Sequence, residues 1–327
     1  MNVVVTGSAG FLGFHLARRL AAAGHRVVCV DNFIRGEDDD WYAELRRRPN
    51  VSHIGADLTR QDSMALLPDD VDVVYHMAAL NGTQNFYERP FEVLRCCALP
   101  TIFLLEKYAA NPALRRFVYA GTSEAYASTV RRFGWEVPTG EEVPLSVDDV
   151  FNERWSYGGS KMHGELAVVA AAKAFGTKFS IVRFHNAYGP RMGDKHVIPD
   201  FLMRAKAGRF ELYGYEDTRS FIYVDDAIEA TLAIGEREAC QGEVINVGGA
   251  REITILELGR TIMKVCGFEN DLVLHPSPKG SVKRRAPKLD KLQRLTGFRE
   301  KWSLEKGLIA TARFYLQDER ASSASLA

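Results

Sequence analysis

A tyrosine and a lysine four positions apart carry the clearest chemical signal in this chain. Tyr157 and Lys161 bracket the run Tyr-Gly-Gly-Ser-Lys, and four residues is about one helical turn, so both side chains project from one helix face. A tyrosine hydroxyl with a pKa of about 10 is a poor base at neutral pH. A lysine ammonium one turn away favours the phenolate, which can then accept a proton from an alcohol. The pair therefore predicts base-assisted oxidation of a hydroxyl group.

A glycine-rich turn near the amino terminus predicts a dinucleotide site. Gly7, Gly10 and Gly13 stand between an expected strand and an expected helix. They permit, in turn, a tight bend, close approach of the backbone to a pyrophosphate, and packing of helix on strand. Asp31 ends the next strand and can accept both ribose hydroxyls, which favours NAD over NADP. Arg35 could favour NADP, but it lies four residues further on and Asp31 is better placed.

Apolar strand runs alternate with helix-length segments through the first half of the chain. The expected strands cover residues 2–6, 26–30, 51–55, 71–75, 116–119 and 179–183. Strands separated by helices indicate right-handed βαβ units, and hence an α/β fold with a doubly wound parallel sheet. The run over residues 71–75 is apolar on both faces, as a buried parallel sheet requires.

Composition and charge exclude several other classes. The 327 residues are 46% hydrophobic and 26% charged, which is ordinary for a globular domain. Lys and Arg number 42, as do Asp and Glu, so nothing favours nucleic acid or anionic membrane, and any anion site must be local. The sequence has no run of 18 apolar residues and no basic leader, so we expect neither a membrane span nor secretion. The five cysteines form no C-x-x-C pair, so we expect no metal and a cytoplasmic location.

The spacing Gly-x-x-Gly-x-x-Gly, with Tyr-x-x-x-Lys, resembles the extended, nucleotide-sugar branch of the short-chain dehydrogenase/reductase superfamily. The resemblance extends over nearly the whole chain. Asp57-Leu58 is similar to the pair that contacts adenine, and His76-Met77-Ala78-Ala79 to the H-x-A-A segment beside the cofactor. The resemblance implies NAD as cofactor, with these contact residues: Gly7, Gly10, Phe11, Leu12, Gly13, Asp31, Asn32, Asp57, Leu58, Ala78, Ala79 and Lys161.

The same resemblance implies a Rossmann-type sheet with a smaller carboxyl-terminal lobe that binds substrate. After about residue 186, loops rich in Gly, Pro and Arg mix with short helices and one more strand-like run, Val244–Val247. We divide the chain into an NAD-binding domain, a substrate lobe and a flexible tail: residues 1–186 with 221–249, 187–220 with 250–317, and 318–327.

The segment from Gly121 to Tyr126 resembles the third catalytic element of the superfamily. A hydroxyl there bonds the reacting oxygen; Thr122 and Ser123 both fit, and Ser123 fits better. Glu124 makes the segment similar to GDP-mannose 4,6-dehydratases and UDP-glucuronate decarboxylases. Its carboxylate could move a proton at C5 or C6 once C4 is a ketone, or it could orient the loop or bind a sugar hydroxyl. Both interpretations remain open.

Three later segments resemble the sugar-nucleotide contacts of this branch, and their cofactor and diphosphate positions are most similar to UDP-glucuronate decarboxylases. They begin at Arg183, Thr218 and Lys283. We expect His76 and His185 to be packing residues and His163 to face solvent. The resemblance implies substrate contacts by Asn81, Thr83, Asn186, Arg191, Arg219, Arg284 and Arg285.

Together these features predict an enzyme that oxidises a nucleotide-diphosphate sugar at C4, using Tyr157, Lys161 and bound NAD, then epimerises it with return of the hydride. Two alternatives use Glu124: decarboxylation of a nucleotide-linked uronate, or 4,6-dehydration of a hexose. An ordinary dehydrogenase that releases NADH and a non-catalytic NAD-binding regulator are further alternatives; the intact Tyr157, Lys161 and Ser123 weigh against the regulator. The apolar helices over 91–109 and 157–175 match the family's four-helix dimer interface, so we expect a homodimer.

Overall fold

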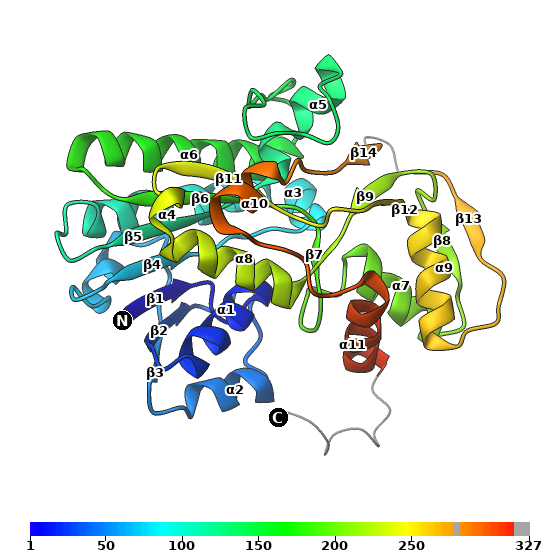
Figure 1. Ribbon diagram of the computed structural model, residues 1–327, viewed down its shortest axis with the longest axis horizontal. Coiled ribbons are helices and arrows are strands. Elements are labelled where there is room, and N and C mark those ends of the chain that lie inside the picture. The colour runs from blue at the N-terminus through cyan, green and yellow to red at the C-terminus, as the bar shows by residue number, and fades with distance from the viewer. Residues whose placement is uncertain (278–281, 317–327) are drawn as a thin grey trace.

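Seven parallel strands form the central sheet of the computed structural model, which describes residues 1–277 and 282–316 (Figure 1). The strands are β1 (Asn2–Thr6), β2 (Arg26–Asp31), β3 (Val51–Gly55), β4 (Val73–His76), β5 (Arg116–Thr122), β6 (Phe179–Phe184) and β11 (Glu243–Val247). Their order is β11-β6-β5-β4-β1-β2-β3, so the connection reverses direction between β1 and β4. Ligands of such sheets bind beyond the carboxyl ends of the strands at this switch point. The predicted fold class is confirmed.

Helices cover both faces of this sheet. Figure 1 shows α4 (Pro90–Tyr108) and α6 (Trp155–Phe175) on one face, and α1 (Phe11–Ala22) and α8 (Val224–Glu236) on the other. Strand β1 explains why both faces need cover: Val3 and Val5 pack into one apolar cluster, and Val4 packs into a second cluster on the opposite face.

Short elements connect these layers. They are α2 (Asp40–Arg46), α3 (Thr83–Glu88), α5 (Ala127–Phe133) and the 3₁₀ turns η1 (Gln61–Leu66), η2 (Ser123–Tyr126) and η3 (Glu238–Cys240). Turn η2 follows β5 directly, and α3 follows the loop after β4, so both lie at the carboxyl edge of the sheet.

A second lobe stands beside this edge (Figure 1). Its strands are β7 (Ala187–Tyr188), β8 (Glu211–Tyr213), β9 (Thr218–Ser220), β10 (Ile222–Tyr223), β12 (Glu252–Thr254), β13 (Val273–His275) and β14 (Arg284–Arg285). They form three small sheets: β10-β7, β12-β9-β14 and β13-β8. The later helices are α7 (Val197–Lys206), α9 (Ile255–Cys266), α10 (Asp290–Thr296) and α11 (Leu304–Leu316). One apolar cluster joins the lobe to the main sheet, with Phe201 and Leu258 in the same core as Val5.

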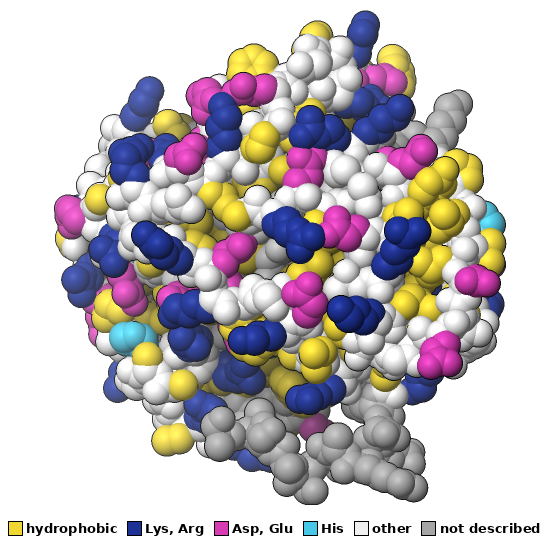
Figure 2. All heavy atoms as spheres, turned by 45° about the vertical axis from the view of Figure 1, so that its right-hand side comes forward, with side chains coloured by type: hydrophobic (Ala, Val, Ile, Leu, Met, Phe, Trp, Pro, Cys, Tyr) yellow, Lys and Arg dark blue, Asp and Glu magenta, His cyan; other side chains and the backbone are white. Residues whose placement is uncertain are grey.

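The chain leaves the main sheet after β6 and returns to it through α8 and β11, which pairs in parallel with β6. The tail predicted over residues 318–327 lies outside the described residues. Within residues 1–277 and 282–316, no helix is both long and apolar enough to cross a membrane. Figure 2 shows acidic and basic side chains intermingled over one face of the molecule, in keeping with the zero net charge.

Candidate active site

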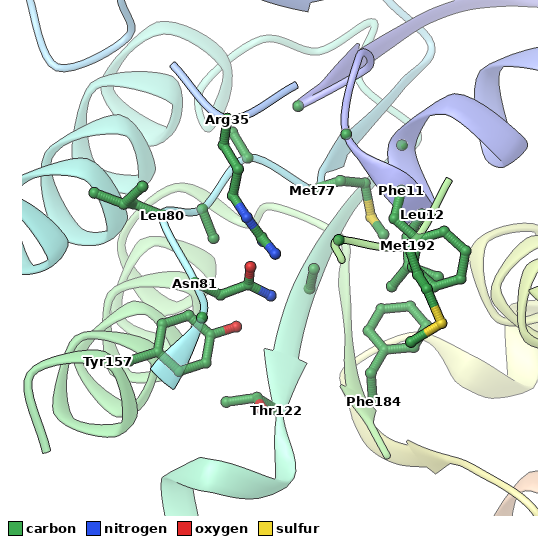
Figure 3. Close-up of a pocket in the computed structure, with 18 of the residues that line it drawn as sticks. Phe11, Leu12, Arg35, Met77, Leu80, Asn81, Thr122, Tyr157, Phe184 and Met192 are labelled. Carbon is green, nitrogen blue, oxygen red and sulfur yellow. The ribbon is translucent and has the colours of Figure 1, made fainter. Parts of the chain in front are cut away.

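Tyr157 and Lys161 lie on the first two turns of α6, and both side chains are buried. The Tyr157 ring stacks on Phe86 of α3, with 5.1 Å between ring centroids and 10° between the planes. Lys161 Nζ donates a hydrogen bond to the Ala120 carbonyl of β5 at 2.8 Å. Both side chains are thus held by neighbouring elements, and the Tyr157 hydroxyl points into a cleft (Figure 3).

The protonation state of Tyr157 depends on charges within this cleft. Burial raises the pKa of Tyr157 above its ordinary value, and Cys97 and Glu124 add to the rise. Arg35 and a hydrogen bond with Thr122 act in the opposite direction. Burial also lowers the pKa of Lys161. Burial and the nearby carboxylate and thiol therefore favour the phenol, and positive charge brought near the ring would favour the phenolate that can take a proton.

The hydroxyl groups of Thr122 and Ser123 lie where β5 gives way to η2. Figure 3 shows Thr122 close to Tyr157, and Ser123 also lines the cleft. Thr122 accepts a hydrogen bond from the Glu124 backbone N–H at 3.3 Å, which fixes the start of η2. The sequence favours Ser123, and since both hydroxyls line the cleft, both stay candidates for the hydrogen bond to the reacting oxygen.

Glu124 lies between two arginines from distant parts of the chain. Its carboxylate is 2.7 Å from Nη1 of Arg285 and 3.3 Å from Nη2 of Arg154. Burial alone would favour the neutral acid, but Arg285 and Arg154 outweigh burial and lower the pKa of Glu124. Arg219 lies close by, and burial together with repulsion from Arg285 lowers its pKa to about 10. This end of the cleft is therefore positively charged even with Glu124 ionised.

The opposite end of the cleft has the features of a dinucleotide cradle. Gly7 has φ of +69°, and a Cβ on Gly13 would lie 2.0 Å from the Gly7 carbonyl oxygen, so neither position accepts a side chain. No side chain caps α1, which leaves its first N–H groups facing the cleft. Asp31 accepts backbone N–H groups from Ala9 and Phe33 at 2.9 and 2.8 Å, which fixes its carboxylate at the end of β2. These residues fit NAD.

One cleft of about 670 Å³ joins the two ends, and its volume is in the range of known cofactor and ligand sites. Of the residues predicted from the sequence, those that line it are Gly7, Gly10, Phe11, Leu12, Gly13, Asp31, Asn32, Asp57, Leu58, Ala78, Ala79, Asn81, Thr83, Thr122, Ser123, Glu124, Tyr157, Lys161, Asn186, Arg191, Arg219 and Arg285. Within the described residues there is no group of three or more His, Cys, Asp or Glu side chains that could hold a metal ion.

The structure corrects the expectation for Arg284. Neighbouring residues on a strand point to opposite sides, so β14 can direct only one of its two arginines into the cleft. Arg285 takes that position. Arg284 instead forms a two-pronged ion pair with Glu252 on the exposed surface.

Arg191 also has another role than the predicted substrate contact. Its guanidinium pairs with Asp39 at 2.7 Å and donates to the carbonyls of Ala9 and Glu37 at 3.3 and 3.1 Å. These bonds tie the loop after β2 to the glycine-rich turn, on the cofactor side of the cleft. Arg191 therefore supports the cofactor side of the cleft, and its predicted contact with the substrate stays a prediction.

Sequence reasoning gave no site role to several residues that line the cleft, among them Arg154 and Phe86, and it considered Arg35 only as a determinant for NADP. Arg154 lies three residues before Tyr157, at the start of the same helix, and this spacing was the available signal. Nothing in the sequence around Phe86 distinguishes it from a core residue, because its role depends on stacking against a distant ring.

The histidines occupy the positions expected. His76 is buried between the hydroxyls of Thr6 and Thr101, at 2.8 and 3.0 Å. His185 is buried against the Tyr126 hydroxyl, and burial lowers its pKa to about 3. His163 is exposed.

Comparison with known proteins places the chain in a family. A sequence model of the NAD dependent epimerase/dehydratase family matches residues 3–248. The chain belongs to this family. It is 32% identical to the UDP-N-acetyl-alpha-D-glucosaminuronate decarboxylase of Bacillus cytotoxicus, over 97% of this chain and 98% of that protein. It is 29% identical to UDP-glucuronic acid decarboxylase 1 of Xenopus tropicalis, over 97% of this chain and 72% of that protein.

One solved structure with a similar fold contains a nucleotide sugar and NAD. The UDP-glucuronic acid 4-epimerase of Bacillus cereus, in complex with UDP-glucuronic acid and NAD, matches with a TM-score of 0.85 and 27% identity. The match covers 97% of this chain and 99% of that one. As a member of the family, the protein is an NAD-dependent enzyme of the epimerase/dehydratase type, and NAD is its cofactor.

Proposed function

We propose that this enzyme decarboxylates a UDP-linked uronate, by oxidising the sugar at C4, releasing C6 as CO₂ and reducing C4 again. The observation that carries the proposal is the position of Arg154 and Arg285 on either side of Glu124, in the same cleft as Tyr157. The single carboxylate of Glu124 balances only one of these two largely buried guanidinium charges, and a sugar with a neutral C6 group would leave the other unbalanced. A uronate carboxylate would balance it, since the planar fork of arginine matches a carboxylate well.

The charge balance at this end of the cleft supports an anionic substrate. Arg154, Arg219 and Arg285 face the carboxylates of Glu124 and Asp217, and the Arg219–Asp217 pair is long, at 3.8 Å. The excess positive charge suits a diphosphate and a sugar carboxylate together.

The activities of the relatives support the same substrate class. The Bacillus cytotoxicus and Xenopus tropicalis proteins are named as decarboxylases of UDP-linked uronic acids. The Bacillus cereus structure holds UDP-glucuronic acid itself. Two different net reactions in these relatives thus start from a UDP-linked uronate.

The chain's own residues account for the first step. When bound, NAD would supply the hydride acceptor for oxidation at C4 and the hydride for its reversal. Tyr157 takes the C4 hydroxyl proton, and Thr122 or Ser123 donates a hydrogen bond to the C4 oxygen. Once C4 is a ketone, the C6 carboxylate is β to it. The C5–C6 bond can then break, its electron pair forming the C4–C5 enolate as CO₂ leaves, and C5 takes up a proton.

Glu124 has a positioning role in this scheme. Its pKa is held low by Arg285 and Arg154, so it remains a carboxylate and is a poor proton donor. It sets the separation and direction of the two guanidinium groups that face the sugar. Of the interpretations that the sequence left open, we therefore propose the positioning role for Glu124.

4-Epimerisation of the same uronate is the second candidate, favoured by the structural match to the Bacillus cereus 4-epimerase. It shares the oxidation step and differs afterwards, because the 4-keto sugar rotates in the site and the hydride returns to the opposite face of C4.

A panel of nucleotide sugars separates these outcomes. The purified protein would be incubated with UDP-glucuronate, its N-acetylglucosamine counterpart and UDP-glucose, and the products weighed by mass spectrometry. We expect loss of one CO₂ from a uronate and no reaction with UDP-glucose. An unchanged mass with an altered sugar would establish epimerisation, and a loss of water would establish dehydration.

We also propose that the enzyme is a homodimer assembled through α4 and α6. These helices pack on each other, yet Phe91 and Leu94 of α4 and Leu166 of α6 stay largely exposed, at 74%, 43% and 66%. Large apolar side chains on adjacent helices suit a four-helix contact between two copies. We further propose a cytoplasmic location, because all five cysteines are free thiols.

A further inference from the structure

The loop after β2 is shaped to carry Arg35 across the glycine-rich turn. Phe33 has φ of +57°, in a region that residues other than glycine rarely adopt, and its N–H is held by the Asp31 carboxylate at 2.8 Å. A Cβ on Gly36 would lie 2.6 Å from Cβ of Ala9, so the loop presses directly against the turn. The chain therefore reverses sharply at Phe33 and crosses over the cradle.

Arg191 fixes the far side of this loop. It bonds the Glu37 carbonyl and the Asp39 carboxylate on the loop, and the Ala9 carbonyl on the glycine-rich turn. The loop is thus fastened both before and after Arg35. The position of the loop is therefore fixed by bonds that do not involve the Arg35 side chain.

The guanidinium of Arg35 enters the cleft. Figure 3 shows it extending toward Asn81 and Tyr157. A Cβ on Gly193 would lie 3.2 Å from its Nη2, so the far wall of the cleft leaves just enough room for it. None of the ion pairs within residues 1–277 and 282–316 involves Arg35. Among the described residues Arg35 thus forms no ion pair, and its charge is available to an anion in the cleft, although Asp194 is near enough to oppose the lowering of its pKa by burial.

The path of NAD through the cleft indicates which anion Arg35 meets. The adenosine ribose belongs at Asp31, and the nicotinamide end belongs at Tyr157. The diphosphate of NAD joins these two ends and must lie between them. Arg35 starts four residues after Asp31 and points toward Tyr157, so it spans the same interval.

We propose that Arg35 binds the diphosphate of NAD as a charged clamp, from the loop side of the cleft, while the glycine-rich turn and the amino end of α1 bind it with backbone N–H groups. Oxidation at C4 and its reversal use the same cofactor molecule, so slow release of NAD is an advantage. Arg35 supplies this retention, whichever net reaction follows at the sugar.

Binding measurements test the clamp without relying on turnover. Arg35→Gln removes the charge, Arg35→Lys keeps it, and Arg284→Gln removes a surface guanidinium outside the cleft as a matched control. Affinities for NAD, ADP-ribose and adenosine would be measured by calorimetry after removal of bound nucleotide, with the release rate of NAD followed from the loaded protein.

We expect Arg35→Gln to bind NAD and ADP-ribose about ten- to a hundred-fold more weakly, as loss of a charge-assisted hydrogen bond implies. Adenosine, which lacks the diphosphate, should bind as before. Arg35→Lys should lose less affinity for NAD and ADP-ribose, and Arg284→Gln should lose none. Unchanged NAD affinity in Arg35→Gln would overturn the proposal, and weakened binding of UDP instead would assign the guanidinium to the substrate. An equal loss of adenosine affinity would show that the variant has only disturbed the loop.

Discussion

The two ends of the cleft are built in different ways. The cofactor end relies on backbone: glycines that accept no side chain, free N–H groups of α1 and one carboxylate, nearly all within the first 31 residues. The sugar end relies on long side chains from distant segments, with Glu124 after β5, Arg154 before α6 and Arg285 on β14. Binding of the cofactor should therefore tolerate changes that abolish chemistry or specificity at the sugar end.

The largest expected effect separates chemistry from cofactor binding. Tyr157→Phe keeps the ring stacked on Phe86 but removes the hydroxyl that takes the C4 proton. Turnover should fall by about a hundred- to ten-thousand-fold, the usual contribution of a positioned base. The NAD content of the purified variant should match that of the native protein. A parallel loss of bound NAD would show that the two ends are not separable.

Glu124→Gln tests the sugar end alone. The variant leaves Arg154 and Arg285 without their shared carboxylate, so they should repel each other and lose their alignment. KM for the uronate should rise by about ten-fold, with NAD affinity unchanged, as expected for one lost charged hydrogen bond. If Glu124 were instead a proton donor, the variant would form NADH and a 4-keto sugar and then stall with KM unchanged.

The same residue predicts a dependence of stability on acid. Because the folded-state pKa of Glu124 is lowered, its stabilisation is complete above the ordinary glutamate value, about 4.3, and is lost as the pH falls through the folded-state pKa. Urea unfolding of the native protein and of Glu124→Gln, measured between neutral pH and strong acid, should therefore converge in acid. A constant gap between the two curves would rule out the ionised pairing.

Arg191 tests the cofactor end, and the surface residue Arg284 serves as its control. Arg191→Met removes the link between the loop after β2 and the glycine-rich turn, so affinity for NAD should fall by several-fold and the melting temperature should drop. Arg284→Met loses only an exposed ion pair and should behave as the native protein does. Equal effects of the two substitutions would contradict the assignments.

His185 gives the smallest expected effect on activity. It is buried as a neutral ring, and its pKa is lowered to about 3, so its contribution to stability is complete above the ordinary value of about 6.5 and is lost toward pH 3. His185→Phe should flatten the fall in unfolding free energy over that interval and leave KM nearly unchanged. The exposed His163→Phe is the control, and it should leave the pH dependence as it was.

The contrast between the two ends also explains what the sequence could predict. The fold class and the cofactor cradle follow from local patterns, because the glycine turn, the strand ending at Asp31 and the Tyr157–Lys161 spacing each lie within a few residues. The sugar end does not follow, because an arginine's partner is set by tertiary contacts. Arg284 and Arg285 are adjacent and alike in sequence, yet strand geometry sends one to solvent and the other to Glu124. Arg35 likewise points toward Tyr157 from a loop that reverses at Phe33, a bend that no local pattern announces.

In the proposed reaction the enzyme oxidises a uronate at C4 with retained NAD and releases CO₂ before the hydride returns. This sequence of steps can be followed in a single turnover of the NAD-loaded protein with UDP-glucuronate, with absorbance at the NADH band recorded in time and the product weighed. We expect a transient rise and fall of NADH and a product lighter by one CO₂, without added NAD. NADH that accumulates and is released, or a product of unchanged mass, would contradict it.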